Sequence, residues 1–99
     1  MHITEDELDV MWLIHKEPET SQRQMADSLG LSLGKVNYCL SALADIGFLK
    51  LDNFKRSKSK ASYVYILTPL GVKAKLVATK RFLKNKQLEY DKLYNYLNK

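Results

Sequence analysis

The stretch LSLGKVNYCLSAL, residues 31–43, decides the fold of this 99-residue chain. Its apolar residues recur at steps of three and four, which predicts an α-helix with one buried face: Leu33, Val36, Leu40 and Leu43. At ~100° per residue, the opposite face carries Gly34, Tyr38, Ser41 and Asp45, flanked by Lys35 and Asn37, where a surface helix typically carries mostly charged residues. An outer face with so little charge suggests that another molecule covers it.

Capping boxes predict where two shorter helices begin before this stretch. Thr4 and Glu7 have the spacing of the first box, and the helix behind them ends before Pro18. Four residues of that helix keep helical spacing: Leu8, Met11, Trp12 and His15. Ser21 and Gln24 form the second box and begin a short helix.

The short helix stops at Gly30, and Ser32 caps the helix of the quoted stretch, which we expect over residues 32–46. Only residues 30–32 separate the two helices. Helices joined so closely cross at a steep angle, which is the helix-turn-helix arrangement.

After Gly47 the period of the pattern changes from 3.6 to 2, and residues 48–54 and 61–68 predict two strands. Residues 55–60 between them read KRSKSK, a basic loop without the Asn-Gly or Asp-Gly of a tight turn. Thr68 and Pro69 then begin a helix that extends to residue 98, about 45 Å long at ~1.5 Å per residue. The predicted fold is mainly α with a small β-hairpin (α+β), a winged helix-turn-helix with a long C-terminal helix.

That last helix is too long to pack along its whole length on so small a body. Apolar residues recur on it every seven positions, with Val72 and Leu93 at intermediate positions: Leu76, Leu83, Tyr90 and Leu97. We expect its start to pack on its own domain and its end to pack on another chain. The chain therefore divides into a winged helix-turn-helix domain, residues 1–75, and a helical extension, residues 76–99, that forms a homodimer.

Charge is unevenly distributed, although the formal net charge is only +5. Residues 1–49 contain three Lys or Arg against eight Asp or Glu, residues 50–68 five against one, and residues 69–99 eight against two. A positive surface from the second half favours an anionic partner, first of all nucleic acid. The apolar runs are too short for a bilayer, the start MHITEDELD is acidic, and one cysteine forms no internal disulfide. We therefore expect a cytoplasmic protein without a membrane partner.

The order of these elements resembles the MarR-type transcriptional regulators. The motifs that carry the resemblance are Leu31–Ser32 with Val36, then Leu43, Gly47 and Leu49, and finally Leu67–Thr68–Pro69–Leu70–Gly71. The chain length and the Tyr- and Lys-rich last helix look closest to the short members associated with exopolysaccharide. The resemblance implies a homodimeric transcriptional regulator that binds double-stranded DNA at specific sequences. MarR-type proteins have further helices around a ligand pocket, so a small-molecule effector stays an open question here.

In such a regulator, the helix at 32–46 enters the major groove, and the hairpin tip at 53–61 is the wing on the DNA backbone or minor groove. Gly34 would let the backbone approach DNA, Asn37 suits adenine, and Tyr38 reaches a thymine methyl or a phosphate. At the start of the second helix, free backbone N–H groups and the helix dipole favour binding of a phosphate. The predicted DNA contacts are Ser21, Gln22, Arg23, Ser32, Gly34, Lys35, Asn37, Tyr38, Ser41, Lys55, Arg56, Lys58 and Lys60.

Plainer interpretations exist for several of these residues. Tyr38 could lie flat over its own domain, residues 55–60 could be a solvated turn, and Ser21 could serve only as a cap. Cys39, at the edge of the apolar stripe, is expected to be a buried small hydrophobe rather than a redox sensor.

Other function classes find less support in the sequence. His2, His15 and Cys39 lack metal-ligand spacing, and no nucleophile–base pair or phosphate-binding glycine loop is evident, so we expect no metal, no cofactor and no enzyme. The alternatives to specific DNA binding are a winged-helix module that docks proteins and a nonspecific nucleic-acid binder.

Overall fold

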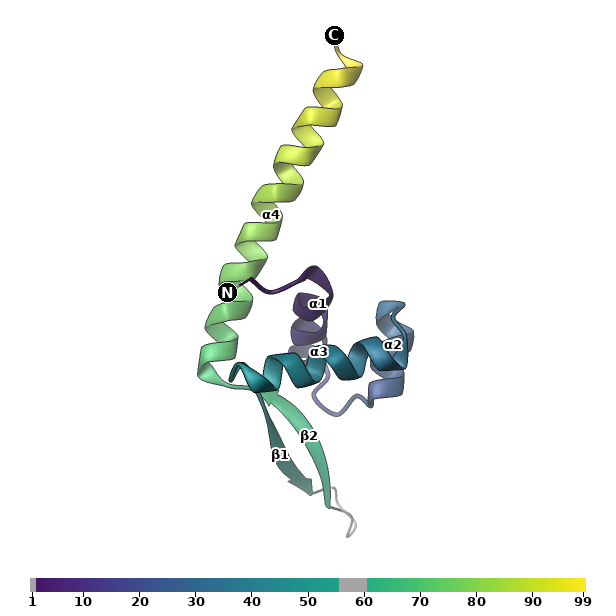
Figure 1. Cartoon of the computed structure of the whole chain (residues 1–99), viewed down its shortest axis with the longest axis vertical. Helices are drawn as coiled ribbons and strands as arrows, with labels where there is room; N and C mark the ends of the chain where they lie inside the picture. Colours follow the sequence, from purple (N-terminus) through teal and green to yellow (C-terminus); the bar gives the residue numbers. More distant parts are fainter. Residues whose placement is uncertain (1, 56–60) are drawn as a thin grey trace.

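The structure, a computed structural model, describes residues 2–55 and 61–99, with the backbone alone described at 53–55 and 61–63. Its elements are α1 (Glu5–Lys16), α2 (Gln22–Leu29), α3 (Leu33–Asp45), β1 (Leu49–Lys55), β2 (Ala61–Leu67) and α4 (Pro69–Leu97). The first three helices form the body, the hairpin extends from it, and α4 leads away in the opposite direction (Figure 1). The predicted fold class is confirmed: a winged helix-turn-helix with a long last helix.

Each helix begins at a residue with a hydroxyl side chain. Both predicted capping boxes form: the Oγ1 of Thr4 accepts a hydrogen bond from the Glu7 N–H, and the Oγ of Ser21 accepts one from the Gln24 N–H, each over 3.1 Å. Gly30 then ends α2 in the left-handed conformation, with φ of 69°, where a side chain would be strained. This turn lets α3 follow α2 after three residues.

The core lies where α1, α2 and α3 meet the start of the hairpin and of α4. Its buried residues include Val10, Met11, Met25, Val36, Leu40, Leu43 and Leu49. One expectation was wrong. Leu33 is 45% exposed although it belongs to the apolar spacing of α3, because the first turn of that helix extends past the body. On α1, Val10 and Ile14 are buried and His15 is exposed.

The hairpin is antiparallel, with a register from Leu49 opposite Leu67 to Lys55 opposite Ala61. Leu49 is 2% exposed, but Leu51 is already 57% exposed. The strands therefore leave the body after their first residues, and most of the hairpin projects beyond the core (Figure 1).

The first half of α4 packs on the body. The N–H of Thr68 donates to the Phe48 carbonyl over 3.1 Å, and the Thr68 hydroxyl donates to the Gly47 carbonyl over 2.6 Å. Further along, Arg81 donates to the Ile3 carbonyl over 2.8 Å, and Lys86 lies 3.3 Å from Glu5. Residues 87–97 are exposed, and they extend the molecule to 64 × 27 × 22 Å. No helix in the described part of the chain is long and apolar enough to cross a membrane.

Candidate nucleic-acid interface

The outer face of α3 is bare. Val36, Leu40 and Leu43 are fully buried and set the rotation of the helix, so Gly34 and Tyr38 must face outward. Tyr38 is 65% exposed, and a Cβ built on Gly34 would meet no atom within 4 Å. Tyr38 therefore does not lie flat over its own domain.

Polar residues from α2 and α3 meet beside this face. The Nδ2 of Asn37 donates to the Oε1 of Gln22 over 3.3 Å, which connects the middle of α3 to the first residue of α2. Because such a bond restricts the rotation of both amides, it presents the remaining Asn37 groups in a defined direction. The structure thus brings Gln22 and Asn37, both predicted DNA contacts, into one cluster.

The two serines at the helix starts act as caps. The Oγ of Ser32 accepts from the Lys35 N–H over 3.0 Å, and the Oγ of Ser21 accepts from the Gln24 N–H. A capping hydroxyl keeps its own proton, so it can still donate to a phosphate oxygen. Arg23 and Ser41, also predicted contacts, are exposed.

Lys35 has partners within the protein. Its Nζ lies 3.9 Å from Oδ2 of Asp6 and 5.7 Å from the centre of the Tyr38 ring. An exposed ion pair of this kind contributes roughly 0–1 kcal/mol, so a phosphate could replace the Asp6 carboxylate at little cost.

Cys39 lies beneath the bare face and is 1% exposed, as predicted for a small core residue. Burial raises the pKa of its thiol, the nearby carboxylate of Glu7 raises it further, and the ammonium of Lys35 opposes them. The neutral thiol is favoured, so this cysteine lacks the thiolate character of a reactive residue. No cluster of three potential metal ligands occurs among residues 2–55 and 61–99.

The predicted wing is described only at its base. Arg56, Lys58 and Lys60 lie outside the described residues, and of Lys55 the backbone alone is described, as the last residue of β1. The described strands place the hairpin beside the C-terminal end of α3, from which β1 follows after three residues (Figure 1).

One surface residue was missed from the sequence. Leu33 stands exposed beside Gly34 at the start of α3, in the part of the helix that carries the candidate contacts. An exposed aliphatic side chain there suits a thymine methyl group. The apolar spacing of the helix predicted that Leu33 is a core residue. Because Leu33 is the first residue of the helix, its exposure could have been expected from that position.

Comparisons with known proteins agree with this geometry. Residues 7–50 match a family described as winged helix-turn-helix DNA-binding, and this segment includes most of α1, all of α2 and α3, and the first two residues of β1. The chain therefore contains a winged helix-turn-helix domain. A comparison with curated protein sequences found no match.

Several solved MarR-family structures share the fold. Staphylococcus aureus MarR in complex with salicylate and kanamycin is 18% identical, with a TM-score of 0.65 over 91% of this chain and 59% of that chain. A MarR/EmrR family regulator from Acinetobacter sp. ADP1 is 20% identical, with a TM-score of 0.67 over 97% of this chain and 72% of that one. The S. aureus MepR–DNA complex is 16% identical, with a TM-score of 0.68 over 90% and 63%. The chain spans about three-fifths of the length of the S. aureus proteins.

Proposed function

We propose that this chain is a transcriptional regulator of the MarR type that binds specific double-stranded DNA sequences as a homodimer. The helix at 32–46 enters the major groove, and the wing at 53–61 contacts the backbone or the minor groove. The bare outer face of α3, with Tyr38 65% exposed and open space at Gly34, is the observation that carries the proposal.

Three features support this assignment. The match to a DNA-binding winged helix-turn-helix family covers α3, and one structural neighbour was solved as a DNA complex. The basic second half of the sequence gives nonspecific attraction to phosphates. The outer face of α3 carries mostly short polar groups, which read base edges better than long like charges do.

The finer features of the proposal rest on the sequence. A cytoplasmic location is part of the proposal and is supported by the single cysteine. The link to exopolysaccharide regulators rests on the Tyr- and Lys-rich last helix. The proposal includes no catalytic activity.

The test begins with selection of bound sequences from a random duplex pool, followed by fluorescence anisotropy with a selected and a random duplex. Tyr38→Ala should weaken binding to the selected duplex about tenfold more than binding to the random one, since it removes a contact to bases. Tyr96→Ala is the matched control, because Tyr96 is 62% exposed, lies near the end of α4, and projects about 140° around the helix from Leu83 at ~100° per residue. It should bind both duplexes as the wild type does.

Lys58→Ala, in the predicted wing, should weaken binding to both duplexes equally and reduce the slope of log affinity against log salt by about one. A pool that yields no preferred sequence would contradict specific recognition and favour the nonspecific binder. Binding to DNA that does not change between low and moderate salt would favour the protein-docking module.

A further inference from the structure

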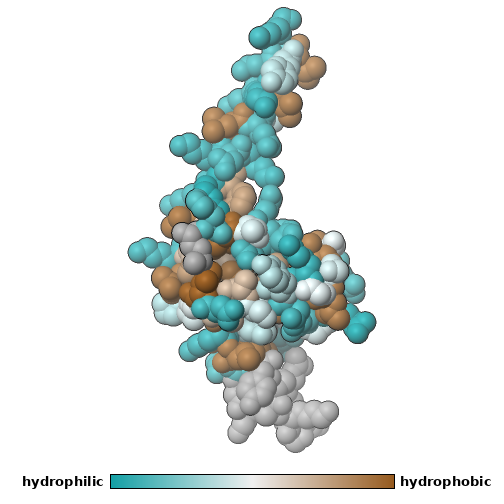
Figure 2. Space-filling view, in the orientation of Figure 1, coloured by the Kyte–Doolittle hydropathy of each residue, from teal (hydrophilic) through white to brown (hydrophobic). Residues whose placement is uncertain are grey.

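Exposed apolar side chains form a stripe on α4 that no other part of the described chain covers. Its members are Val72, Leu76, Leu83, Tyr90 and Tyr94, which are between 42% and 68% exposed. At ~100° per residue they all lie within about 20° of the direction of Leu83. The rings of Tyr90 and Tyr94 stack with centroids 6.1 Å apart, and apolar patches are visible along the projecting helix (Figure 2).

The stripe differs from the face of α4 that packs on the body. That face carries the buried Gly71, Lys75 and Ala78, which lie about 80–140° around the helix from Leu83 at ~100° per residue. Thr79 and Lys86, which contact Trp12 and Glu5 of the body, lie on the same side at about 40° and 60° from Leu83. The body therefore borders one edge of the stripe and leaves its apolar residues exposed.

The spacing of the stripe is symmetric about Leu83. Leu76 and Val72 precede it by 7 and 11 positions, and Tyr90 and Tyr94 follow it by the same 7 and 11. If a second copy runs antiparallel with its two-fold axis at Leu83, each apolar residue meets an apolar residue: Leu83 meets itself, Leu76 meets Tyr90, and Val72 meets Tyr94. The contact would extend over residues 72–94, about 33 Å at ~1.5 Å per residue.

A parallel pair would match the stripe as well, but the charges favour the antiparallel arrangement. Residues 69–86 contain six Lys or Arg and no acid, whereas both acids of the helix, Glu89 and Asp91, lie beyond them. Parallel helices would place the two basic halves side by side, where they repel each other. Antiparallel helices place the basic half of each helix beside the half of its partner that carries Glu89 and Asp91. Lys73 and Asp91 both project about 80° to the same side of Leu83. In the antiparallel pair, Lys73 of one helix therefore lies beside Asp91 of the partner helix, and Asp91 of the first lies beside Lys73 of the partner.

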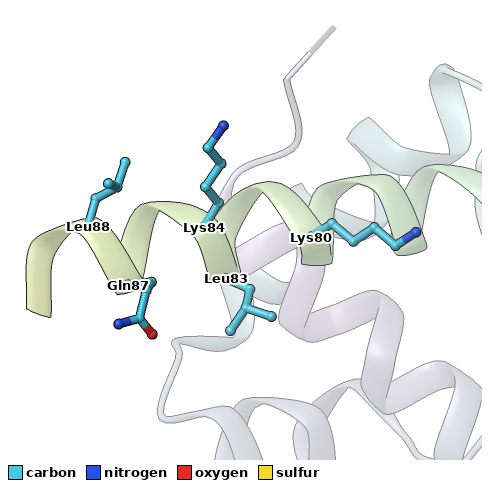
Figure 3. Close-up of a pocket in the computed structure, with 5 residues that line it drawn as sticks. All are labelled: Lys80, Leu83, Lys84, Gln87 and Leu88. Carbon is cyan, nitrogen blue, oxygen red and sulfur yellow. The ribbon is translucent and has the colours of Figure 1, made fainter. Parts of the chain in front are cut away.

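We propose that α4 pairs with α4 of a second copy in the antiparallel direction, with the two-fold axis at Leu83. The inference rests on the proposed homodimer and names its register. Leu83 borders a shallow hollow of about 420 Å³, together with Lys80, Lys84, Gln87 and Leu88. In this region Leu83 and Gln87 project from one side of the helix, and Lys84 and Leu88 project from the other (Figure 3).

Disulfide formation tests the register in a Cys39→Ala background, which removes the native thiol. Leu83→Cys should cross-link to itself under mild oxidation, because the axis brings the two copies of this position together. Val72→Cys alone and Tyr94→Cys alone should stay uncross-linked, and a mixture of the two should give the heterodimer. In a parallel pair, Val72→Cys would cross-link to itself, and that result would overturn the register.

Sedimentation of the uncross-linked protein provides a second measurement. Leu83→Asp should raise the dimer dissociation constant at least tenfold, because two carboxylates would meet at the axis. Leu88→Asp is the matched control, since Leu88 is 58% exposed against 68% for Leu83 but lies on the other side of the helix. Equal effects of the two variants, or a dimer in which Leu83→Cys does not cross-link, would overturn the proposal.

These measurements need no DNA, so they separate the possible failures. A dimer that cross-links in the parallel pattern leaves the homodimer standing and refutes only the register. A wild-type protein that stays monomeric yet binds the selected duplex refutes the homodimer and leaves DNA recognition standing.

Discussion

The indole N–H of Trp12 donates a hydrogen bond to the Oγ1 of Thr79 over 2.9 Å and joins α1 to α4 across 67 positions of the chain. The ammonium of Lys75, one turn before Thr79, lies 3.9 Å from the centre of the Trp12 ring. The Thr79 hydroxyl in turn donates to the Lys75 carbonyl over 2.7 Å. This cluster holds the projecting helix on the body, so the direction of α4 depends on it.

Breaking the bond between Trp12 and Thr79 should destabilise the fold. Trp12→Phe and Thr79→Val should each lower the free energy of unfolding by about 1–2 kcal/mol. Trp12→Phe removes the indole donor and weakens the contact with the Lys75 ammonium, and Thr79→Val leaves the part-buried indole N–H without its acceptor. The loss of unfolding free energy in the double variant should be smaller than the sum of the two single losses by about 0.5–1.5 kcal/mol. Urea denaturation at one protein concentration measures all four proteins, and strictly additive effects would show that the bond contributes nothing.

Lys75 makes stability depend on pH. Its side chain is buried, and burial lowers the pKa of the ammonium below the usual 10.5. Between the lowered pKa and 10.5 the unfolded chain binds more protons than the folded chain, so stability contributed by this site rises with pH in that interval. In Lys75→Met the site no longer titrates. As pH rises toward 10.5, the difference in free energy of unfolding between wild type and variant should therefore shift in favour of the wild type, and a constant difference would contradict the burial of a charged lysine.

Gly71 allows α4 to approach the turn before β1. A Cβ at this position would overlap the carbonyl oxygen of Phe48 and lie 2.9 Å from its carbonyl carbon. Gly71→Ala should therefore lower the free energy of unfolding by about 1–3 kcal/mol, despite the better helix propensity of alanine. Thermal denaturation measures the effect, and an unchanged or higher melting temperature would show that the helix start moves freely.

Gly34 gives the opposite expectation, because a methyl group there meets open space. Gly34→Ala should raise the free energy of unfolding by about 0.5–1 kcal/mol through helix propensity alone. The same methyl should weaken binding to the selected duplex if the backbone of α3 approaches the DNA at this point. A variant that is more stable and binds as tightly as the wild type would show that the first turn of α3 stays clear of the bases.

The helix starts could be predicted because they depend on residues close in sequence. The caps at Thr4, Ser21, Ser32 and Thr68 each accept a hydrogen bond from the backbone three positions later, and all four form as expected. The strand period and the length of α4 also follow from local pattern and propensity.

Burial at the edges of the body could not be predicted in this way. Leu33 and Leu51 have the spacing of core residues but are exposed, because the first turn of α3 and most of the hairpin project past the body. Lys75 is buried against the ring of Trp12, which is far away in sequence. The pairing of Asn37 with Gln22 depends likewise on how α2 and α3 cross, which no local pattern specifies.

The bond between Asn37 and Gln22 leads to the last prediction. Asn37→Ala should weaken the free energy of binding to the selected duplex by about 1–3 kcal/mol, and it should relax the base preference at one position of each half-site. Gln22→Ala should weaken binding to the same duplex several-fold, because it frees the Asn37 amide that the 3.3 Å bond holds in place. In the Asn37→Ala background, the loss from Gln22→Ala should largely disappear. If Gln22→Ala costs the same in both backgrounds, Gln22 acts on DNA independently and does not position Asn37. Anisotropy titrations of the four proteins against the selected and random duplexes decide between these outcomes.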